Sequence, residues 1–385
     1  MGAGPAGLLL GNVLRSEGID CVILERQSRS HVEQRARAGF LAANTVRVLT
    51  DNGLSAGLDR HGRRHDTCAF RSHLPQFVLN YGQLGRGEVH TVYPQQELVR
   101  DLIAEFLARG GDLRFGVAAQ AVEGIDTDRP SVVCRDEDGR LHRWTGQFVA
   151  GCDGQHGVSR LAVPIEAARR YQRDHAISWL AVLAEAPQSM PTVTYAIHDQ
   201  GFAGHMARSA TVTRYYLQCA ADDDPADWPD ERIWEQLHVR MRASEYGDLV
   251  TGQISERRVI TMASNVTDPI QYGRLFLVGD AASLISPSAA KGANLAVMEA
   301  ETLAHALIAY LRRDNEKPLA RYSAECLPRV WRAQEFSHWM LNLLHGPPPY
   351  AADADFLRAL QRTRLDRLSS SRAHQEVFAE SYIGI

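Results

Sequence analysis

The sequence predicts an α/β fold in which a mostly antiparallel β-sheet domain is inserted into a doubly wound, parallel-sheet domain, with helices at the C-terminus. Over residues 2–160, predicted strands alternate with helices, the pattern of a parallel sheet covered by crossover helices. Over residues 174–265, β-branched and polar residues alternate, for example in 192–196 and 211–219, which is typical of antiparallel strands. From Arg274 the α/β pattern resumes, and long helical segments follow.

The chain begins with a glycine-rich motif. Residues 2–7 read Gly-Ala-Gly-Pro-Ala-Gly, the G-x-G-x-x-G pattern that holds a pyrophosphate between a strand and a helix. Gly2 and Gly4 let the backbone approach phosphate oxygens because no Cβ stands in the way. Gly7 lets the following helix pack closely on the sheet, and the amides and dipole of that helix attract the phosphate.

The segments after this motif support the same interpretation. Residues 8–15 continue as a helix that Gly18 ends, and residues 19–24 read as a buried parallel strand. Glu25 follows that strand, about 20 residues after the motif, where a carboxylate that binds a ribose is placed. Together these features predict a Rossmann-like, dinucleotide-binding domain. The alternative interpretation is a glycine-rich turn in another α/β protein.

Composition limits the class of protein. The net charge of −4 argues against a surface for nucleic acid, and no apolar run is long enough to span a membrane. The six cysteines have neither C-x-x-C nor metal-type spacing, so we expect free thiols in a reducing compartment. The sequence therefore predicts a cytoplasmic protein without a bound metal, membrane or nucleic-acid partner.

Two further strand-to-turn elements carry cofactor chemistry. Residues 274–282 form an apolar strand that ends at Asp280, whose carboxylate can meet a ribose hydroxyl. Residues 287–294 then open a helix whose N-terminus favours negative charge, such as that of a reduced flavin ring. Residues 148–160 form a strand, an Asp-Gly pair and a basic turn. Each element alone is equally compatible with an ordinary strand-to-helix turn.

In this order and spacing, the chain resembles the FAD-dependent aromatic hydroxylases (group A flavoprotein monooxygenases), and in particular the para-hydroxybenzoate hydroxylases. The resemblance runs from Gly2 to Gly384. It includes Arg35-Ala-Arg37-Ala-Gly39, Thr91-Val-Tyr93, Arg208-Ser-Ala-Thr, Arg214-Tyr-Tyr216 and Tyr382-Ile-Gly. It implies a homodimer that hydroxylates a 4-hydroxybenzoate-type acid ortho to an activating group, with FAD, O2 and NADPH or NADH, through a flavin C4a-hydroperoxide.

The resemblance also implies cofactor residues. Those expected to hold FAD are Gly2, Gly4, Gly7, Glu25, Arg37, Gln95, Asp280, Lys291, Asn294 and Arg214. Arg214 corresponds to the arginine that helps the flavin swing between two positions. Those expected to face the nicotinamide nucleotide are Arg26, Gln27, Arg35 and His156. Ala263 replaces an arginine and His31 a tyrosine, so the choice between NADPH and NADH stays open.

The implied substrate site is a phenol-activating pocket. Arg208 and Tyr216 would bind the substrate carboxylate, and the backbone carbonyl of Pro287 would help to fix the phenol. Tyr195, Tyr382 and His65 would relay the phenol proton to solvent, because a phenolate reacts faster with an electrophilic oxygen donor than a phenol does. A histidine suits the outer end of this relay, since its pKa lies near neutrality.

Departures from the family pattern leave the substrate open. Met206, expected to line the substrate pocket, stands where a serine usually hydrogen-bonds the carboxylate, and such a bond is worth about 1.5–3 kcal/mol. Gly204 and His205 replace an apolar pair, and Phe40 is bulkier than the usual valine. The alternatives are therefore a substituted substrate such as 3-amino-4-hydroxybenzoate, or an inactive FAD-binding paralogue. A flavin-dependent halogenase would need a W-x-W-x-I-P signature, which the sequence lacks.

The resemblance suggests four segments. The FAD-binding domain spans 1–173, of which 67–93 contributes to the substrate side, and resumes over 266–345. The substrate-binding sheet spans 174–265, and 346–385 forms a C-terminal helical segment. Family members have one further strand before the glycine motif. We therefore expect a natural start a few residues earlier, and an extension of about six apolar residues, a typical strand length, should tighten FAD binding.

Overall fold

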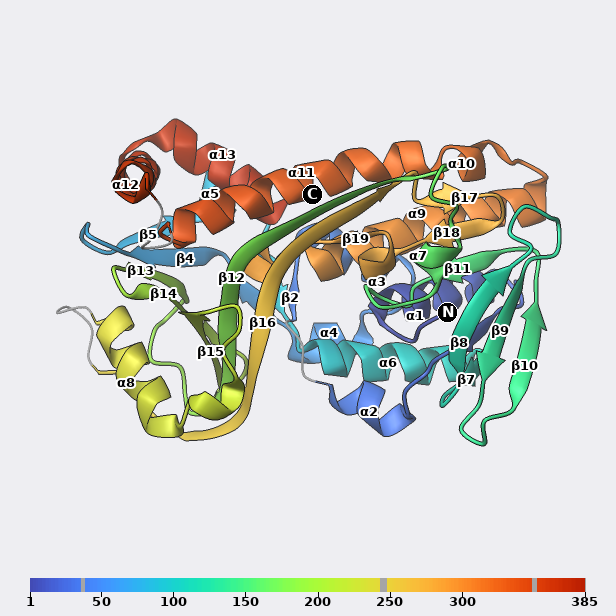
Figure 1. The fold of residues 1–385 in the computed structure, drawn as a ribbon, viewed down its shortest axis with the longest axis horizontal. Helices are drawn as coiled ribbons and strands as arrows, with labels where there is room; N and C mark the ends of the chain where they lie inside the picture. The colour runs from blue at the N-terminus through green and yellow to red at the C-terminus, as the bar shows by residue number, and fades with distance from the viewer. Residues whose placement is uncertain (36–38, 243–247, 348–351, 385) are drawn as a thin grey trace.

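The computed structural model describes residues 1–35, 39–242, 248–347 and 352–384. Figure 1 shows an elongated molecule with two lobes. The long strands β12 (Arg169–Glu185) and β16 (Gln253–Asp268) run from one lobe to the other, and helix α11 (Tyr322–Leu344) lies along both. Within the described residues, no helix is long and apolar enough to cross a membrane.

The first lobe contains short parallel strand pairs flanked by helices. β1 pairs with β7 and β11 with β18, both in parallel, and β17 joins β18 in antiparallel fashion. A separate antiparallel sheet, β8 to β10, closes the far edge (Figure 1). The strands of this lobe are β1 (Val22–Leu24), β7 (Asp112–Arg114), β8 (Ala118–Glu123), β9 (Ser131–Arg135), β10 (Leu141–Thr145), β11 (Val149–Gly151), β17 (Gln271–Tyr272) and β18 (Leu275–Leu277).

The longer helices of the first lobe, α1, α6 and α9, bury apolar residues in its core. Helix α1 begins at Pro5, whose fixed φ suits the first helical position. Gly11 of α1 is needed for close packing, since a Cβ there would lie 2.9 Å from the Phe106 ring of α6. The helices are α1 (Pro5–Ser16), α2 (Arg29–Gln34), α3 (Ala43–Asp51), α4 (Ala56–His61), α6 (Gln95–Ala108), α7 (Ser159–Ala162), α9 (Gly292–Arg313) and α10 (Lys317–Ala320).

Backbone hydrogen bonds link the two parallel strand pairs through the first residues. The Met1 amino group donates to the Ala150 carbonyl (2.8 Å), and the Cys152 N–H donates to the Met1 carbonyl (2.9 Å). On the other side, the Gly2 N–H donates to the Leu24 carbonyl (2.7 Å). The glycine motif therefore starts between β11 and β1.

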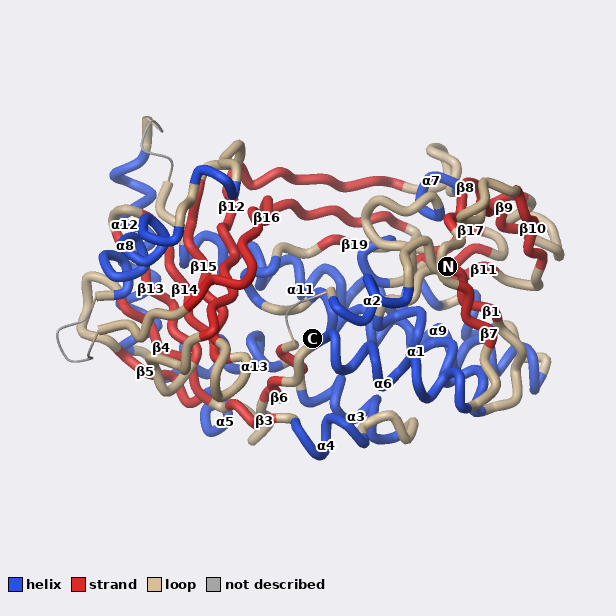
Figure 2. Tube along the Cα trace, turned by 90° about the horizontal axis from the view of Figure 1, so that it is seen from below, coloured by secondary structure: helices blue, strands red, loops and turns tan. Residues whose placement is uncertain are grey.

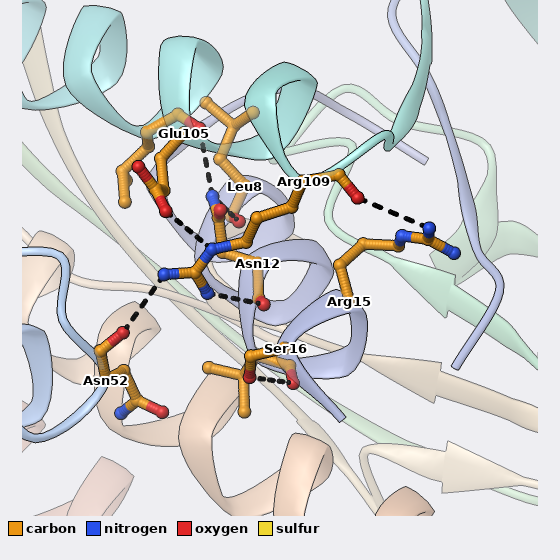
Figure 3. Close-up of polar contacts among 9 residues, drawn as sticks. Leu8, Asn12, Arg15, Ser16, Asn52, Glu105 and Arg109 are labelled. Carbon is orange, nitrogen blue, oxygen red and sulfur yellow. Dashed lines mark hydrogen bonds and ion pairs between the residues drawn. The ribbon is translucent and has the colours of Figure 1, made fainter. Parts of the chain in front are cut away.

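An arginine at the end of α6 connects α6 to α1 by hydrogen bonds (Figure 3). The Arg109 guanidinium donates to the carbonyls of Asn12 (3.1 Å) and Asn52 (3.4 Å), and its Nε donates to Glu105 (2.7 Å). Arg15 of α1 in turn donates to the Arg109 carbonyl (3.3 Å). Since α1 carries the glycine motif at its start, these contacts also fix that motif relative to α6.

The second lobe is built on a mixed sheet in the order β19-β16-β12-β15-β14-β13-β4-β5, eight strands within the described residues. All neighbours are antiparallel except β13 and β4, so the predicted, mostly antiparallel sheet is confirmed. Its other strands are β4 (Thr67–Arg71), β5 (Phe77–Asn80), β13 (Val193–His198), β14 (Gly201–Ala207), β15 (Thr213–Cys219) and β19 (Ser283–Leu284). Helix α8 (Asp230–Met241) packs on it.

The C-terminal helices α11, α12 (Ala354–Ser370) and α13 (Arg372–Ile383) cover this sheet near β4 and β5 (Figure 1). A buried cluster that includes Phe70, Trp179, Phe336, Phe378 and Tyr382 fills the space between sheet and helices. A small sheet lies beside α13 (Figure 2). It consists of β2 (Phe40–Leu41), β6 (His90–Val92) and β3 (Arg63–His65), and the short helix α5 (Tyr81–Leu84) lies next to it.

Candidate active site

A cavity of about 590 Å³ extends from the glycine motif of the first lobe to the eight-stranded sheet of the second. Most residues predicted from the sequence line it. They are Gly2, Gly4, Glu25, Arg26, Gln27, Arg35, Gln95, His156, Tyr195, Met206, Arg214, Tyr216, Asp280, Pro287 and Tyr382. Other predicted residues lie close to the cavity but outside its lining: Gly7, His65, Arg208, Lys291 and Asn294. Arg37 lies outside the described residues.

The three glycines of the motif serve different purposes. Gly2 has φ +97°, and a Cβ there would lie 2.3 Å from the Cys152 carbonyl oxygen. A Cβ on Gly7 would lie 2.1 Å from the Gly2 carbonyl oxygen, so both positions need glycine for close backbone packing. A Cβ on Gly4 would meet nothing within 4 Å, because this residue faces the cavity. The space over Gly4 at the start of α1 fits a phosphate group.

Glu25 is held at the end of β1 by its neighbours. Its two carboxylate oxygens accept hydrogen bonds from the backbone N–H groups of Ala3 and Gln27, both at 2.8 Å. The carboxylate thus couples the glycine motif to the next strand while it lines the cavity. This position suits a ribose hydroxyl.

The side chain of Asn294 is committed to the protein rather than to the cavity. Its Oδ1 accepts from the Ala42 N–H and the Thr45 hydroxyl (both 2.8 Å), and its Nδ2 donates to the carbonyls of Phe40 (3.0 Å) and Ala290 (2.9 Å). These bonds use both the oxygen and the nitrogen of the Asn294 amide, and its expected role toward FAD stays a prediction. Backbone at the start of α9, at Gly292 and Ala293, lines the cavity instead.

Lys291 also faces away from the cavity. Its Nζ donates to the carbonyls of Tyr382 (2.8 Å) and Gly384 (2.7 Å). Burial lowers the pKa of Lys291 to about 7. Lys291 therefore anchors the end of α13, and its expected role in holding FAD stays a prediction.

Strand register places the substrate-side residues on one face of the sheet. Tyr195 lies opposite Gly204, Gly204 opposite Tyr216, and Tyr216 opposite Ala181. Met206 lies opposite Arg214 in the next row on that face, since residues two apart point the same way. All of these residues line the cavity.

Aromatic rings enclose Gly204. A Cβ on this glycine would lie 3.0 Å from the Phe202 ring and 3.4 Å from the Tyr216 ring. The indole of Trp179 packs 4.9 Å from both rings, and its Nε1 donates to His345 (2.6 Å). A glycine inside a strand often marks the close approach of a ligand, which fits this aromatic chamber.

The sequence did not identify several cavity residues, namely Trp179, Phe202, Glu256 and Arg258. The Glu256 carboxylate lies 3.7 Å from the Arg214 guanidinium, and Arg258 lies two residues further on the same face of β16. The alternation of residues along their strands could have indicated which side chains share a face. That pattern shows which face lines the cavity only when the pairing of the strands is known.

Arg208 directly follows Ala207, the last residue of β14. Its side chain is buried and lies outside the lining of the cavity. Burial lowers the pKa of its guanidinium, while Tyr216 raises it. Of the two residues predicted to bind the carboxylate, Tyr216 lines the cavity, as do Met206 and Arg214, whereas Arg208 lies outside the lining.

The two tyrosines of the predicted relay are hydrogen-bonded to each other, whereas the histidine is hydrogen-bonded to other residues. The hydroxyls of Tyr195 and Tyr382 lie 2.7 Å apart. His65 Nδ1 lies 2.9 Å from the Tyr81 hydroxyl, and its Nε2 accepts from the Val193 N–H (3.3 Å). The structure therefore gives no hydrogen bond between Tyr382 and His65 among the described residues. Burial raises the pKa of both Tyr195 and Tyr382 and lowers that of His65 to about 4.

A cluster of hydroxyl groups fixes the loop that carries Pro287. The Oγ atoms of Ser286, Ser288 and Ser337 lie 2.7–3.0 Å from one another, and Ser337 also donates to the Ser286 carbonyl (3.1 Å). Because Ser337 belongs to α11, this helix positions the Pro287 backbone at the cavity.

Comparisons with known proteins agree with this geometry. A family model described as "FAD binding domain" matches residues 1–337. The p-hydroxybenzoate hydroxylase of Acinetobacter baylyi is 34% identical over all of this chain and 94% of its own length. A 3-amino-4-hydroxybenzoate 2-monooxygenase of Streptomyces cremeus is 28% identical over 92% of this chain and 89% of its own. The crystal structure of p-nitrophenol 4-monooxygenase from Pseudomonas putida superposes with a TM-score of 0.82 at 18% identity, covering 100% of this chain and 97% of that one. The chain belongs to the family of FAD-binding aromatic hydroxylases.

Proposed function

We propose that this flavoprotein hydroxylates a 4-hydroxybenzoate-type aromatic acid ortho to an activating group, with O2 and with NADPH or NADH as the electron donor. The observation that carries the proposal is the Tyr195–Tyr382 hydroxyl pair at the cavity, on the same sheet face as Arg214 and Tyr216. It supplies a route for a phenolic proton beside the guanidinium of Arg214, a cationic group that suits a carboxylate.

The residues of the first lobe fit FAD. Gly4 leaves room for a phosphate, Glu25 and Asp280 line the same cavity for ribose hydroxyls, and the start of α9 offers backbone amides to an electron-rich ring. When bound, FAD takes electrons from the nicotinamide and activates O2 for transfer of one oxygen atom. Arg26, Gln27, Arg35 and His156 line the cavity where the nicotinamide nucleotide would approach.

The residues of the second lobe bind and activate the phenol. Tyr195 accepts a hydrogen bond from the substrate phenol and passes its own proton to Tyr382, so the substrate becomes a better nucleophile. The Pro287 backbone lines the same cavity and offers its carbonyl as an alternative acceptor for the phenol O–H. Arg214 and Tyr216, backed by the buried Arg208, orient the carboxylate.

The shape of the chamber favours a substituted substrate. Met206 provides no hydrogen bond to a carboxylate, and Gly204, which carries no side chain, lies between Tyr195 and Tyr216 in the strand register. One relative carries the name 3-amino-4-hydroxybenzoate 2-monooxygenase. An amino or additional hydroxyl group on the ring is compatible with this altered wall, so this substrate class is our second candidate.

A panel of benzoates tests the proposal. Purified holoenzyme is given 4-hydroxybenzoate, its 3-amino and 3-hydroxy derivatives and benzoate, with NADH and with NADPH, and hydroxylated product is measured against electron donor consumed. We expect coupled product formation with at least one phenolic acid and none with benzoate. Arg208→Ala should raise the substrate Kd while FAD stays bound. A yellow protein that oxidises neither donor faster with any phenolic acid would overturn the proposal and leave an inactive FAD-binding protein.

A further inference from the structure

The indole N–H of Trp179, at the wall of the aromatic chamber, is hydrogen-bonded to a buried histidine. Trp179 lines the cavity and is 3% exposed. It shares a sheet face with Ala181, two residues further on, which lies opposite Tyr216. Its Nε1 donates to His345 Nε2 at 2.6 Å, and His345 is 5% exposed. The indole N–H is therefore bound within the protein and is not offered to a ligand in the chamber.

The end of a helix holds His345 in place. His345 directly follows Leu344, the last residue of α11, and Figure 1 shows that this helix ends in the second lobe. Its backbone N–H donates to the Leu341 carbonyl at 3.0 Å, and its ring Nδ1 donates to the same carbonyl at 2.9 Å. Histidine side chains near a helix C-terminus often bind such carbonyls. The imidazole is thus fixed to α11 on one side and to Trp179 of β12 on the other.

The two partners determine the protonation state of His345. A carbonyl oxygen only accepts and an indole N–H only donates, so the proton of the neutral ring lies on Nδ1 and Nε2 is free to accept. Burial lowers the pKa of His345 to about 4, against an opposing effect of the bond to Leu341. Near neutral pH the imidazole therefore stays uncharged and keeps its acceptor for Trp179.

His345 also supports a second ring of the chamber. The Phe202 ring packs against His345 with centroids 5.4 Å apart and against Trp179 at 4.9 Å. Trp179 packs at the same distance from Tyr216. Phe202 and Tyr216 are the side chains nearest to a Cβ placed on Gly204. A displacement of the indole would therefore change the wall that a substrate ring meets.

We propose that His345 is a positioning residue, which fixes the Trp179 indole in the chamber wall and thereby sets the affinity for the aromatic acid. This inference rests on the proposed function. A buried indole N–H needs a partner, so a single acceptor at a fixed place selects one orientation of the ring. An apolar side chain at position 345 would leave this N–H unpaired, which is unfavourable in a buried site. The indole would then move until its N–H meets water or a ligand, and the shape of the wall would change.

Ligand affinity of the FAD-loaded protein tests this inference, with 4-hydroxybenzoate and its 3-amino derivative as probes. His345→Leu removes the acceptor, and the Kd of the acid that binds better, followed by flavin absorbance, should rise about tenfold. His345→Gln restores an acceptor near the position of Nε2 and should recover most of the affinity. A purely structural role would lower the thermal midpoint of His345→Leu but leave the Kd of its FAD-loaded fraction unchanged, and that result would overturn the inference.

A double-mutant cycle shows whether His345 acts through Trp179. Trp179→Phe keeps an aromatic ring but has no N–H, so in that background His345→Leu should change the Kd by less than about twofold. A tenfold rise in both backgrounds would show that His345 does not act through the indole, and would overturn the inference. The controls are His305→Leu, exposed on α9, and Trp331→Phe, exposed on α11, and both should keep the unmodified Kd.

The unmodified holoenzyme provides a test that needs no variant of His345. With 15N-labelled histidine and tryptophan, an N–H···N bond gives a scalar coupling between its two nitrogens, and the signal of Trp179 is identified by its loss in Trp179→Phe. We expect a coupling from Trp179 Nε1 to His345 Nε2 that persists when ligand binds, and its absence would overturn the inference. If the unmodified holoenzyme binds no phenolic acid, the proposed function itself fails; if it binds them and His345→Leu has the same Kd, only this inference fails.

Discussion

The hydroxyl groups of Tyr195 and Tyr382 lie 2.7 Å apart, although 187 residues separate them in the sequence. Tyr195 belongs to β13 of the eight-stranded sheet and Tyr382 to the last helix, so the C-terminal helix completes the chamber. Burial raises the pKa of both groups, which keeps both tyrosines neutral. A neutral pair passes a proton along its shared hydrogen bond without storing charge.

Tyr195→Phe should separate electron transfer from hydroxylation. Without the hydroxyl, the phenol has no first proton acceptor, and the rate of product formation should fall by about 10²-fold. Oxidation of the electron donor should continue and yield hydrogen peroxide instead. The measurement is the ratio of hydroxylated product to NADPH or NADH consumed.

Tyr310→Phe provides the matched control. Tyr310 packs edge-on against Phe148 in the first lobe and does not line the cavity. This variant should keep the normal ratio of product to consumed donor. If Tyr195→Phe also keeps the normal rate and ratio, the tyrosine pair does not carry the proton.

Glu299 predicts a pH dependence of stability. Its carboxyl is buried beneath the Gly279–Asp280 turn, and one oxygen accepts from the Gly279 N–H (2.6 Å). Burial raises the pKa of Glu299 from 4.5 to about 8, so between these values the folded protein holds a proton that the unfolded chain has lost. The stability that this group contributes is therefore full below about pH 4.5 and falls as the pH rises toward 8, by about 1.4 kcal/mol for each pH unit in that window.

Glu299→Gln should remove this loss. The amide oxygen still accepts from Gly279, but the side chain cannot ionise. Thermal unfolding of the FAD-loaded protein is measured between pH 5 and pH 8, and the variant should gain on the unmodified protein as pH rises. Glu316→Gln, at an exposed position, is the control and should follow the unmodified curve. Parallel curves for all three proteins would contradict a proton held at Glu299.

Local patterns predicted residues that line the part of the cavity in the first lobe, whereas long-range packing decides the orientation of others. Gly2, Gly4, Glu25 and Asp280 were identified because strand ends and glycines mark backbone turns within short windows. The direction of the His65 ring depends on Tyr81 and Val193, which come from other elements.

Two further features were beyond sequence reasoning for the same reason. The amide of Asn294 bonds to Ala42 and Thr45, about 250 residues away, so its turn from the cavity leaves no local signal. Trp179 reaches the chamber because β12 pairs with both β15 and β16, a pairing that alternation within one strand does not specify. The alternation predicts which residues of one strand share a face, but it does not predict which strands lie next to it.

Asn294→Ala should destabilise the start of α9. It leaves the buried N–H of Ala42 and the carbonyl of Phe40 without their partners, at a cost of about 1–3 kcal/mol for each unpaired group. The thermal midpoint should fall and the FAD Kd should rise, because these bonds join β2 and α3 to α9, whose first residues line the cavity. Differential scanning fluorimetry and flavin fluorescence measure the two effects.

Asn342→Ala tests whether any asparagine on these helices has the same effect. Asn342 is exposed on α11, and its amide donates to His338 of the same helix, so its loss should leave both quantities near normal. Asn294→Asp keeps the acceptor for Ala42 but loses the donor to Phe40, and should fall between the two. An Asn294→Ala protein with normal stability would show that these four bonds contribute little.

Gly204→Ala should change which benzoates the enzyme accepts. A Cβ at this position would lie 3.0 Å from the Phe202 ring and 3.4 Å from the Tyr216 ring, so it would press on these rings and narrow the chamber beside Tyr195. If the natural substrate carries an amino or hydroxyl substituent there, kcat/KM for the substituted acid should fall by roughly tenfold, corresponding to about 1.4 kcal/mol, and that for 4-hydroxybenzoate should fall less. Gly146→Ala, at a site where a Cβ would make only ordinary contacts, should alter neither value. An equal loss for both substrates would place the substituent elsewhere in the chamber, since a general disturbance of Phe202 and Tyr216 does not discriminate between them.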